Sequence, residues 1–239
     1  MTKELFLEDS YLKTMTATIL EIHPEAPGKW KLVLSETIFY PKGGGQPSDQ
    51  GILFTEDWKG KIYQVLSQEG KILHYVEAAT PPPSPGEKIQ GELDWERRYL
   101  NMRLHSAGHI IDFALHLLKY ELTPLKADHG KKATIWYQGI LNVDFRETLE
   151  SKANTLVSED LRFSNQFVSH DVLTKKALYI QPNLPTNKPL RMLTLETVGS
   201  VADGGTQVCK TKEVGRIRLL PIEVKDGTTL IRYSIEDNA

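Results

Sequence analysis

The chain has 239 residues, of which 40% are hydrophobic and 25% charged, and its formal net charge is −2. This composition is ordinary for a soluble globular protein, and the charge excludes a strongly basic protein that coats nucleic acid nonspecifically. The single cysteine, Cys209, excludes an intramolecular disulfide, the N-terminus lacks the features of a secretory signal, and no apolar run reaches the roughly 20 residues of a membrane span. We therefore expect a cytoplasmic protein.

The first part of the chain, residues 1–93, carries short runs of β-branched and apolar residues between turn signals. Closely spaced strands of this kind predict a small β-barrel or sandwich. The predicted strands lie in the segments TATILEI, WKLVLSE, GILFT, KIYQVLS, KILHYVE and KIQGELD. Before the last of them, the prolines of ATPPPSPGEKI exclude a helix or a central strand, and we interpret this segment as a linker or a stiff connecting loop.

The second part, residues 94–239, changes to helical periodicity. Apolar residues from Trp95 to about Tyr120 recur at helical spacing and predict a long amphipathic helix. A strand (KATIWYQG), a second amphipathic helix (RETLESKANTLVSEDLRF) and a buried strand (PLRMLTLETV) follow, and Asp226-Gly227 indicates a C-terminal hairpin. The predicted fold class is α+β, with an N-terminal barrel-like domain (1–93) and a C-terminal domain (94–239) that has a mostly antiparallel sheet.

Two histidines, His105 and His109, stand four residues apart on the predicted long helix. This spacing puts both imidazoles on one face, close enough to hold one metal ion, although such a pair also occurs by chance. A zinc protease would need a glutamate directly after the first histidine, and Ser106 stands there, so the protease interpretation is excluded. Asp112 and His116 continue the same stripe, either as partners that orient a ligand or as solvated polar residues.

Two glycine-containing stretches are also candidates for function. In FYPKGGGQPSDQG, the three glycines Gly43, Gly44 and Gly45 precede Gln46. They either allow the backbone to approach a ligand closely or form only a flexible hairpin loop. SVADGGTQVCKTKEVG, residues 200–215, is a polar turn that follows a buried strand, and functional groups often lie on such loops.

Taken in this order, the three stretches resemble the free-standing alanyl-tRNA editing proteins, the AlaX family, which is related to the editing domain of alanyl-tRNA synthetase. The resemblance covers nearly the whole chain, including TKEVG at residues 211–215. It implies an N-terminal β-barrel, an α/β two-layer editing domain and a hydrolase that removes serine or glycine from mischarged tRNA for alanine. It also implies site residues: His105, His109 and Thr206 for catalysis, and Gly43, Gly44, Gly45 and Gln46 for substrate binding, with Gln46 and Thr206 as candidates for recognising the serine hydroxyl.

The same resemblance implies a zinc site, with one departure from the family's pattern. Where the family has CGGTHV, this chain has Asp203-Gly204-Gly205-Thr206-Gln207-Val208, so Asp203 and Gln207 join His105 and His109 at the four ligand positions. A carboxylate is an ordinary zinc ligand, whereas a neutral amide is a weak one. Three alternatives follow: all four ligands, with Cys209 able to replace Gln207 only if the loop shifts; the three ligands His105, His109 and Asp203 with a water molecule; or no bound metal.

The implied partner is mischarged tRNA for alanine, with neither a membrane nor DNA as a partner and with a monomer as a plausible state. Basic residues near the predicted histidine helix could contact tRNA phosphates: Arg97, Arg98, Arg103, Lys126, Lys131 and Lys132. The altered residues Asp203 and Gln207 leave a second hypothesis open. The chain would then be a degenerate relative that binds RNA or an acylated ligand without editing.

Overall fold

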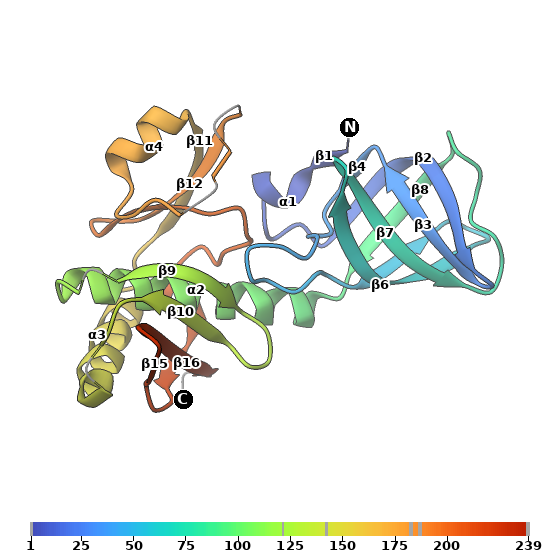
Figure 1. Ribbon diagram of the computed structural model, residues 1–239. Helices are drawn as coiled ribbons and strands as arrows, with labels where there is room; N and C mark the ends of the chain where they lie inside the picture. The colour runs from blue at the N-terminus through green and yellow to red at the C-terminus, as the bar shows by residue number, and fades with distance from the viewer. Residues whose placement is uncertain (1, 121, 142, 182–183, 186–187, 238–239) are drawn as a thin grey trace. The chain divides into compact units, whose positions relative to one another are not determined.

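The computed structural model describes residues 2–120, 122–141, 143–181, 184–185 and 188–237 (Figure 1). The chain groups into two compact units, Met1–Asn101 and Met102–Ala239. The predicted division into domains 1–93 and 94–239 stays a prediction, because compactness alone does not show which segment folds independently.

Unit 1 contains the closed antiparallel barrel that the strand pattern predicts (Figure 1). The six strands follow the order β2-β3-β7-β6-β5-β8 around it. Their bounds are β2 (Thr14–Ala26), β3 (Lys29–Leu34), β5 (Gly51–Phe54), β6 (Lys59–Gln68), β7 (Lys71–Ala78) and β8 (Lys88–Leu93). A short helix α1 (Leu5–Glu8) and a parallel pair of two-residue strands, β1 (Lys3–Glu4) and β4 (Glu36–Thr37), also lie in this unit.

The barrel closes because alternate residues of its strands are apolar and point inward. In β8, for example, Ile89 and Leu93 are buried while Lys88, Gln90 and Glu92 are exposed. The proline-rich segment joins β7 to β8, two strands of the same barrel. It is therefore a connecting loop within the barrel and not a linker between domains.

The strands of unit 2 pair antiparallel, as predicted, but they form two sheets where one was expected. The larger has the order β14-β16-β10-β9, with β15 paired to β16, and the smaller has the order β11-β12-β13. The strands are β9 (Thr123–Asp128), β10 (Thr134–Gln138), β11 (Phe163–Val168), β12 (Leu190–Leu195), β13 (Gly199–Ala202), β14 (Arg216–Leu219), β15 (Glu223–Lys225) and β16 (Thr228–Glu236). The helices are α3 (Arg146–Ser158), α4 (His170–Lys176) and the 3-10 turns η1 (Val143–Phe145) and η2 (Thr211–Val214).

The long predicted helix is α2 (Trp95–Leu117), which begins in unit 1 and continues into unit 2 (Figure 1). It ends before the predicted Tyr120 because Lys119 adopts a left-handed conformation, with φ of 60°, which stops the helical hydrogen-bond pattern. Ala107, Ile111 and Ala114 are fully buried on its apolar face. No helix in the described part of the chain is long and apolar enough to cross a membrane.

The predicted C-terminal hairpin is also present. Strands β15 and β16 pair with Lys225 opposite Thr228, and the two residues between them both have positive φ, 49° at Asp226 and 73° at Gly227. Positive φ at both central positions defines a type I′ turn, which matches the twist of the strands and explains the Asp-Gly sequence.

Candidate metal centre

Three potential metal ligands meet in unit 2, two from α2 and one from the loop after β13. The ligand atoms of His105, His109 and Asp203 all lie within 4.8 Å of one another. Asp203 Oδ1 is 3.3 Å from His105 Nε2 and 3.5 Å from His109 Nε2. Two ligand atoms bound to one tetrahedral zinc ion are about 3.3–3.4 Å apart, so these separations suit two edges of such a site. The resemblance predicted these three residues as ligands, and the fold brings them together.

The carboxylate of Asp203 is fixed in place by three neighbours. Its Oδ1 accepts from the backbone N–H of Gly205 at 3.1 Å, in a local turn. Its Oδ2 accepts from the side-chain amide of Gln207 at 2.9 Å and lies 3.5 Å from an Arg191 guanidinium nitrogen. Oδ1 is thereby the oxygen that faces the two histidines.

Gln207 joins this carboxylate to the histidine helix. Its amide oxygen accepts from the Ser106 hydroxyl at 2.6 Å, and that hydroxyl oxygen accepts from the backbone N–H of Val208 at 3.1 Å. The amide nitrogen of Gln207 therefore faces the carboxylate, and the side chain would have to rotate for its oxygen to reach an ion. Its role as a ligand stays a prediction. Cys209 is exposed and lies outside the ligand cluster.

Burial and charge set the protonation of the centre. Burial lowers the pKa of His105, although Asp203 opposes the effect. Burial also acts to lower the pKa of His109, but the carboxylates of Asp112 and Asp203 outweigh it and raise that pKa to about 9. Burial acts to raise the pKa of Asp203, and the two histidines overcome this and hold it well below its usual range. These effects favour the ionised form of Asp203 and make His109 the more basic of the two imidazoles.

A buried polar network supports His109 from the side away from Asp203. Asp112 Oδ2 lies 3.7 Å from His109 Nδ1. The same carboxylate accepts hydrogen bonds from Tyr179, at 2.9 Å, and from Tyr137. Burial raises the pKa of both tyrosines well above the usual value, and the charge of Asp112 adds to the effect, so both remain donors. Of the two sequence interpretations of Asp112, the structure favours a partner that orients His109.

A third histidine, His129, packs against the pair, and sequence reasoning missed it. Its ring stacks on that of His105, with 4.3 Å between centroids and 19° between planes. Tyr233 donates its hydroxyl hydrogen to the Leu104 carbonyl at 3.0 Å, so its oxygen accepts from His129 Nδ1 at 2.6 Å. Burial, with the neighbouring histidines, holds the pKa of His129 well below the usual value, so the ring is neutral.

The glycine within HSAGH makes room for this third ring. A Cβ atom on Gly108 would lie only 2.6 Å from His129 Cε1. A glycine in the middle of a helix costs about 1 kcal/mol relative to alanine, and close packing of another side chain is a physical reason to keep it. This glycine is the one sequence signal that could have pointed to an additional partner for the helix.

The donor set fits a zinc ion. Two imidazoles and a carboxylate are ordinary zinc ligands, and a site with three protein ligands keeps a position for water. Both ring nitrogens of His109 are buried and lack a hydrogen-bond partner among the described residues. Buried polar atoms are usually satisfied, and an ion between His109 and Asp203 would satisfy Nε2.

The remaining predicted site residues lie in different places. Gly43 and Gln46 close a tight turn in unit 1 through two backbone hydrogen bonds, of 3.2 and 2.8 Å, and Gly44 and Gly45 have positive φ, of 53° and 79°. The conformation of the turn thus favours glycine at positions 44 and 45. Thr206 is buried in the Asp203–Gln207 loop of unit 2. The catalytic and substrate-binding roles of these residues stay predictions.

The predicted basic contacts to tRNA are only partly accessible. Arg98 is fully buried in an ion pair with Asp49, so the prediction that it contacts phosphates is wrong. Arg103 donates to the Val214 carbonyl at 2.9 Å and pairs with Asp237 at 2.7 Å, and Arg97 donates to Ser48. Three exposed lysines remain from the predicted set: Lys126, which lies over the Trp136 ring, and Lys131 and Lys132.

The sequence of this chain is similar to those of known proteins. The family model of class II (A) tRNA synthetases matches residues 11–97. An alanyl-tRNA editing protein, AlaX-M of Saccharolobus solfataricus, is 30% identical over 247 residues, which cover 99% of this chain and 100% of that protein. AlaX-L of Pyrococcus horikoshii is 32% identical over 92% of this chain, and an alanine–tRNA ligase of Haloquadratum walsbyi is 32% identical over 100% of it. This chain spans only 54% of that AlaX-L and 26% of that ligase.

Proposed function

Because the chain belongs to the alanyl-tRNA editing protein family, we propose that it hydrolyses the ester that joins a wrong amino acid to the tRNA for alanine. The observation that supports this function is the cluster of His105, His109 and Asp203, which assembles the donor set of a catalytic zinc site. In the reaction, water adds to the acyl carbon and the bond to the ribose oxygen breaks. The products are the free amino acid and the uncharged tRNA.

His105, His109 and Asp203 would hold the zinc ion. A zinc ion supplies Lewis-acid polarisation and acidifies a bound water at neutral pH. The protein's own part is to keep the ligands oriented: Gln207 and Arg191 fix the Asp203 carboxylate. Asp112 faces Nδ1 of His109, so Nε2 is the nitrogen directed at Asp203.

The proposed substrates are seryl- and glycyl-tRNA for alanine. A pocket built for alanine rejects glycine only weakly and cannot strongly exclude serine, so a second hydrolytic site is needed to correct both errors. Acceptance of serine over alanine requires a polar group that binds the extra hydroxyl. Thr206, which lies next to Gln207, and Gln46 are the candidates.

The test is deacylation of seryl-, glycyl- and alanyl-tRNA for alanine by zinc-supplied protein. We expect the serine ester to be hydrolysed faster than the alanine ester, and His105→Ala to abolish the difference. The control is His23→Ala, which removes an exposed histidine in unit 1, and it should retain the unmutated rate. No turnover above background by the unmutated protein would overturn the proposal.

A second candidate function is favoured by one observation. At the two altered positions, the Gln207 side-chain amide donates a hydrogen bond to the Asp203 carboxylate. Each of these two side chains therefore has a hydrogen-bond partner within the protein. A relative of this kind would bind the charged tRNA without hydrolysing it. Saturable binding of seryl-tRNA together with no release of serine would favour this second function over the first.

A further inference from the structure

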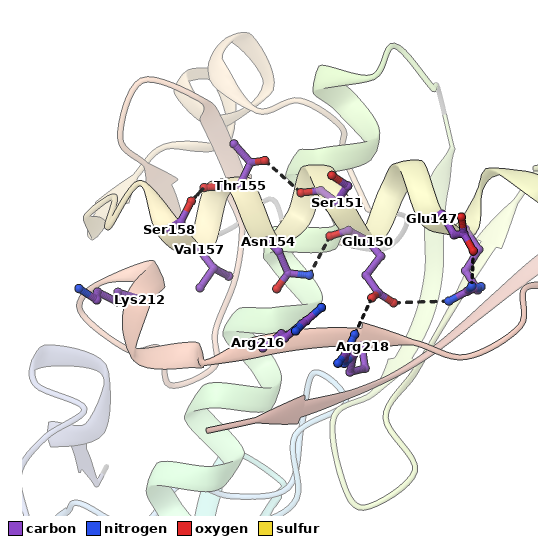
Figure 2. A pocket seen from close by; sticks show the side chains of 11 residues that line it. Glu147, Glu150, Ser151, Asn154, Thr155, Val157, Ser158, Lys212, Arg216 and Arg218 are labelled. Carbon is purple, nitrogen blue, oxygen red and sulfur yellow. Dashed lines mark hydrogen bonds and ion pairs between the residues drawn. The ribbon is translucent and has the colours of Figure 1, made fainter. Parts of the chain in front are cut away.

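A polar groove lies in unit 2 between α3 and the segment formed by η2 and β14 (Figure 2). We call it the α3 groove. Its volume is about 870 Å³, and none of the residues of the metal centre lines it. The lining residues are predominantly polar and charged: Arg146, Glu147, Glu150, Ser151, Asn154, Thr155, Val157, Ser158, Lys212, Arg216 and Arg218.

One wall of the α3 groove is a row of hydroxyl groups. Ser151, Thr155 and Ser158 are exposed and follow the spacing that places residues on one helix face. Thr155 donates to the Ser151 carbonyl at 3.0 Å, and Ser158 donates to the Thr155 carbonyl at 2.8 Å. Serine and threonine hydroxyl groups can donate to phosphate oxygens in nucleic-acid complexes, but each has a single hydrogen, so Thr155 and Ser158 would first have to rotate away from these carbonyls.

Cations dominate the charged side chains of the α3 groove. Four cations and two carboxylates line it, in a chain whose formal net charge is −2. Arg218 pairs with Glu236 at 3.0 Å and with Glu150 at 3.4 Å. Arg216 is exposed and makes no ion pair with any described residue. Its guanidinium group is therefore available to an anion.

The two walls are joined rigidly. Asn154 of α3 donates to the Ile217 carbonyl of β14 at 2.8 Å and accepts from the Ile217 N–H at 2.9 Å. Glu150 accepts from the Leu219 N–H at 2.8 Å. These bonds hold the strand against the helix, so an anion would bind a preformed surface and little ordering would oppose binding.

Residues of the α3 groove are also close in sequence to residues of the metal centre. Lys212 follows Gln207 by five residues, so their Cα atoms cannot be more than about 18 Å apart. Arg103, two residues before His105, donates to the Val214 carbonyl and ties η2 to α2. A long polyanion with its end in the metal centre could therefore pass along the groove.

We propose that the α3 groove binds backbone phosphates of the tRNA substrate, with Arg216 and Lys212 as the principal cationic contacts. This inference rests on the proposed function, since it locates part of the substrate of the same editing site. An RNA backbone carries one negative charge at each phosphate, and the phosphate oxygens accept hydrogen bonds. Exposed cations beside hydroxyl groups suit both properties. Arg98 was expected to contact tRNA phosphates but is buried with Asp49. The cations of the α3 groove would provide positive charge for that contact instead.

The test measures binding of uncharged tRNA for alanine by fluorescence anisotropy across a range of salt concentrations. In Lys212→Ala/Arg216→Ala, we expect weaker binding at low salt. The slope of log affinity against log salt should become shallower by about 1.8, which corresponds to two lost phosphate contacts. The matched control is Lys175→Ala/Lys176→Ala, which removes two exposed lysines of α4 in the same unit and should keep the unmutated slope.

The outcomes separate the two proposals. An unchanged slope in Lys212→Ala/Arg216→Ala, or an equal loss in the α4 control, overturns the groove proposal. If the unmutated protein still hydrolyses seryl-tRNA in that case, the proposed function stands. Arg216→Lys, which keeps the charge, should retain most of the binding. If the unmutated protein neither binds tRNA nor hydrolyses its ester, both proposals fail.

Discussion

His109 lies between two carboxylates, with Nδ1 3.7 Å from Asp112 Oδ2 and Nε2 3.5 Å from Asp203 Oδ1. A histidine whose one ring nitrogen faces a carboxylate presents the other nitrogen, in a fixed orientation, to a metal ion. Because Tyr137 and Tyr179 both donate to Asp112, that carboxylate cannot easily turn away. The orientation of His109 is therefore set by residues that would not touch the metal.

Asp112→Asn is expected to weaken zinc binding by about 10- to 100-fold, because an amide orients the imidazole less firmly and makes it a weaker donor. The measurement is the zinc dissociation constant from competition with a chelator. Glu96→Gln, which neutralises a carboxylate in the first turn of the same helix, serves as the control. Equal zinc affinity in Asp112→Asn and the control would show that Asp112 does not position His109.

Restoring the family's ligands should strengthen the site. In Asp203→Cys/Gln207→His, a thiolate and an imidazole replace a carboxylate and an amide, and both are stronger zinc donors. We expect tighter zinc binding than in the unmutated protein, and weaker binding in Asp203→Asn, measured as bound zinc per chain after dialysis. If the double substitution does not increase retention, the Asp203–Gln207 loop does not present these positions to the ion.

Local patterns predicted the fold well where one periodicity dominates. Strand alternation predicted the barrel, and the Asp226-Gly227 pair predicted the final hairpin. The proline-rich loop was harder, because proline excludes regular structure but does not say whether the flanking strands belong to one sheet or to two. Only the pairing of β8 with β2 and β5 settles that question.

The candidate site was predictable only for residues that share a motif. His105 and His109 share a helix face, and Asp203 occupies a family ligand position. His129 and Tyr179 come from other segments, and no short-range spacing relates them to α2. Arg98 shows the opposite error: its place near the histidine helix predicted a contact with tRNA phosphates, whereas its charge is buried with Asp49.

The barrel should lose stability in mild acid through His74. This side chain is fully buried, donates from Nδ1 to the Leu32 carbonyl and accepts at Nε2 from Thr37. Burial, only partly opposed by the bond to Leu32, lowers its pKa from 6.5 to about 4. Between these values the unfolded chain binds a proton that the folded chain does not, so the free energy of unfolding falls as the pH falls.

The expected loss from this group is about 3 kcal/mol as the pH falls from about 7.5 to about 4, and it is negligible above that range. It can be measured by urea denaturation at several pH values. His74→Gln should be less stable at neutral pH but should lack this part of the acid dependence. An identical acid dependence in His74→Gln would mean that other groups cause it.

The buried pair Arg98–Asp49 should be required for the stability of unit 1. Both side chains are fully buried, and Arg98 also donates to the Ser10 carbonyl at 2.8 Å. Arg98→Met leaves the Asp49 carboxylate buried without its cation, which costs about 3–5 kcal/mol. Because Arg98→Met/Asp49→Leu removes both charges, the double substitution should be more stable than the single one.

The control for loss of an arginine is Arg97→Met, at the half-buried neighbour that donates to the Ser48 carbonyl. Urea denaturation of the four proteins decides the matter: equal stability of Arg98→Met and the unmutated protein would contradict a structural role for the pair.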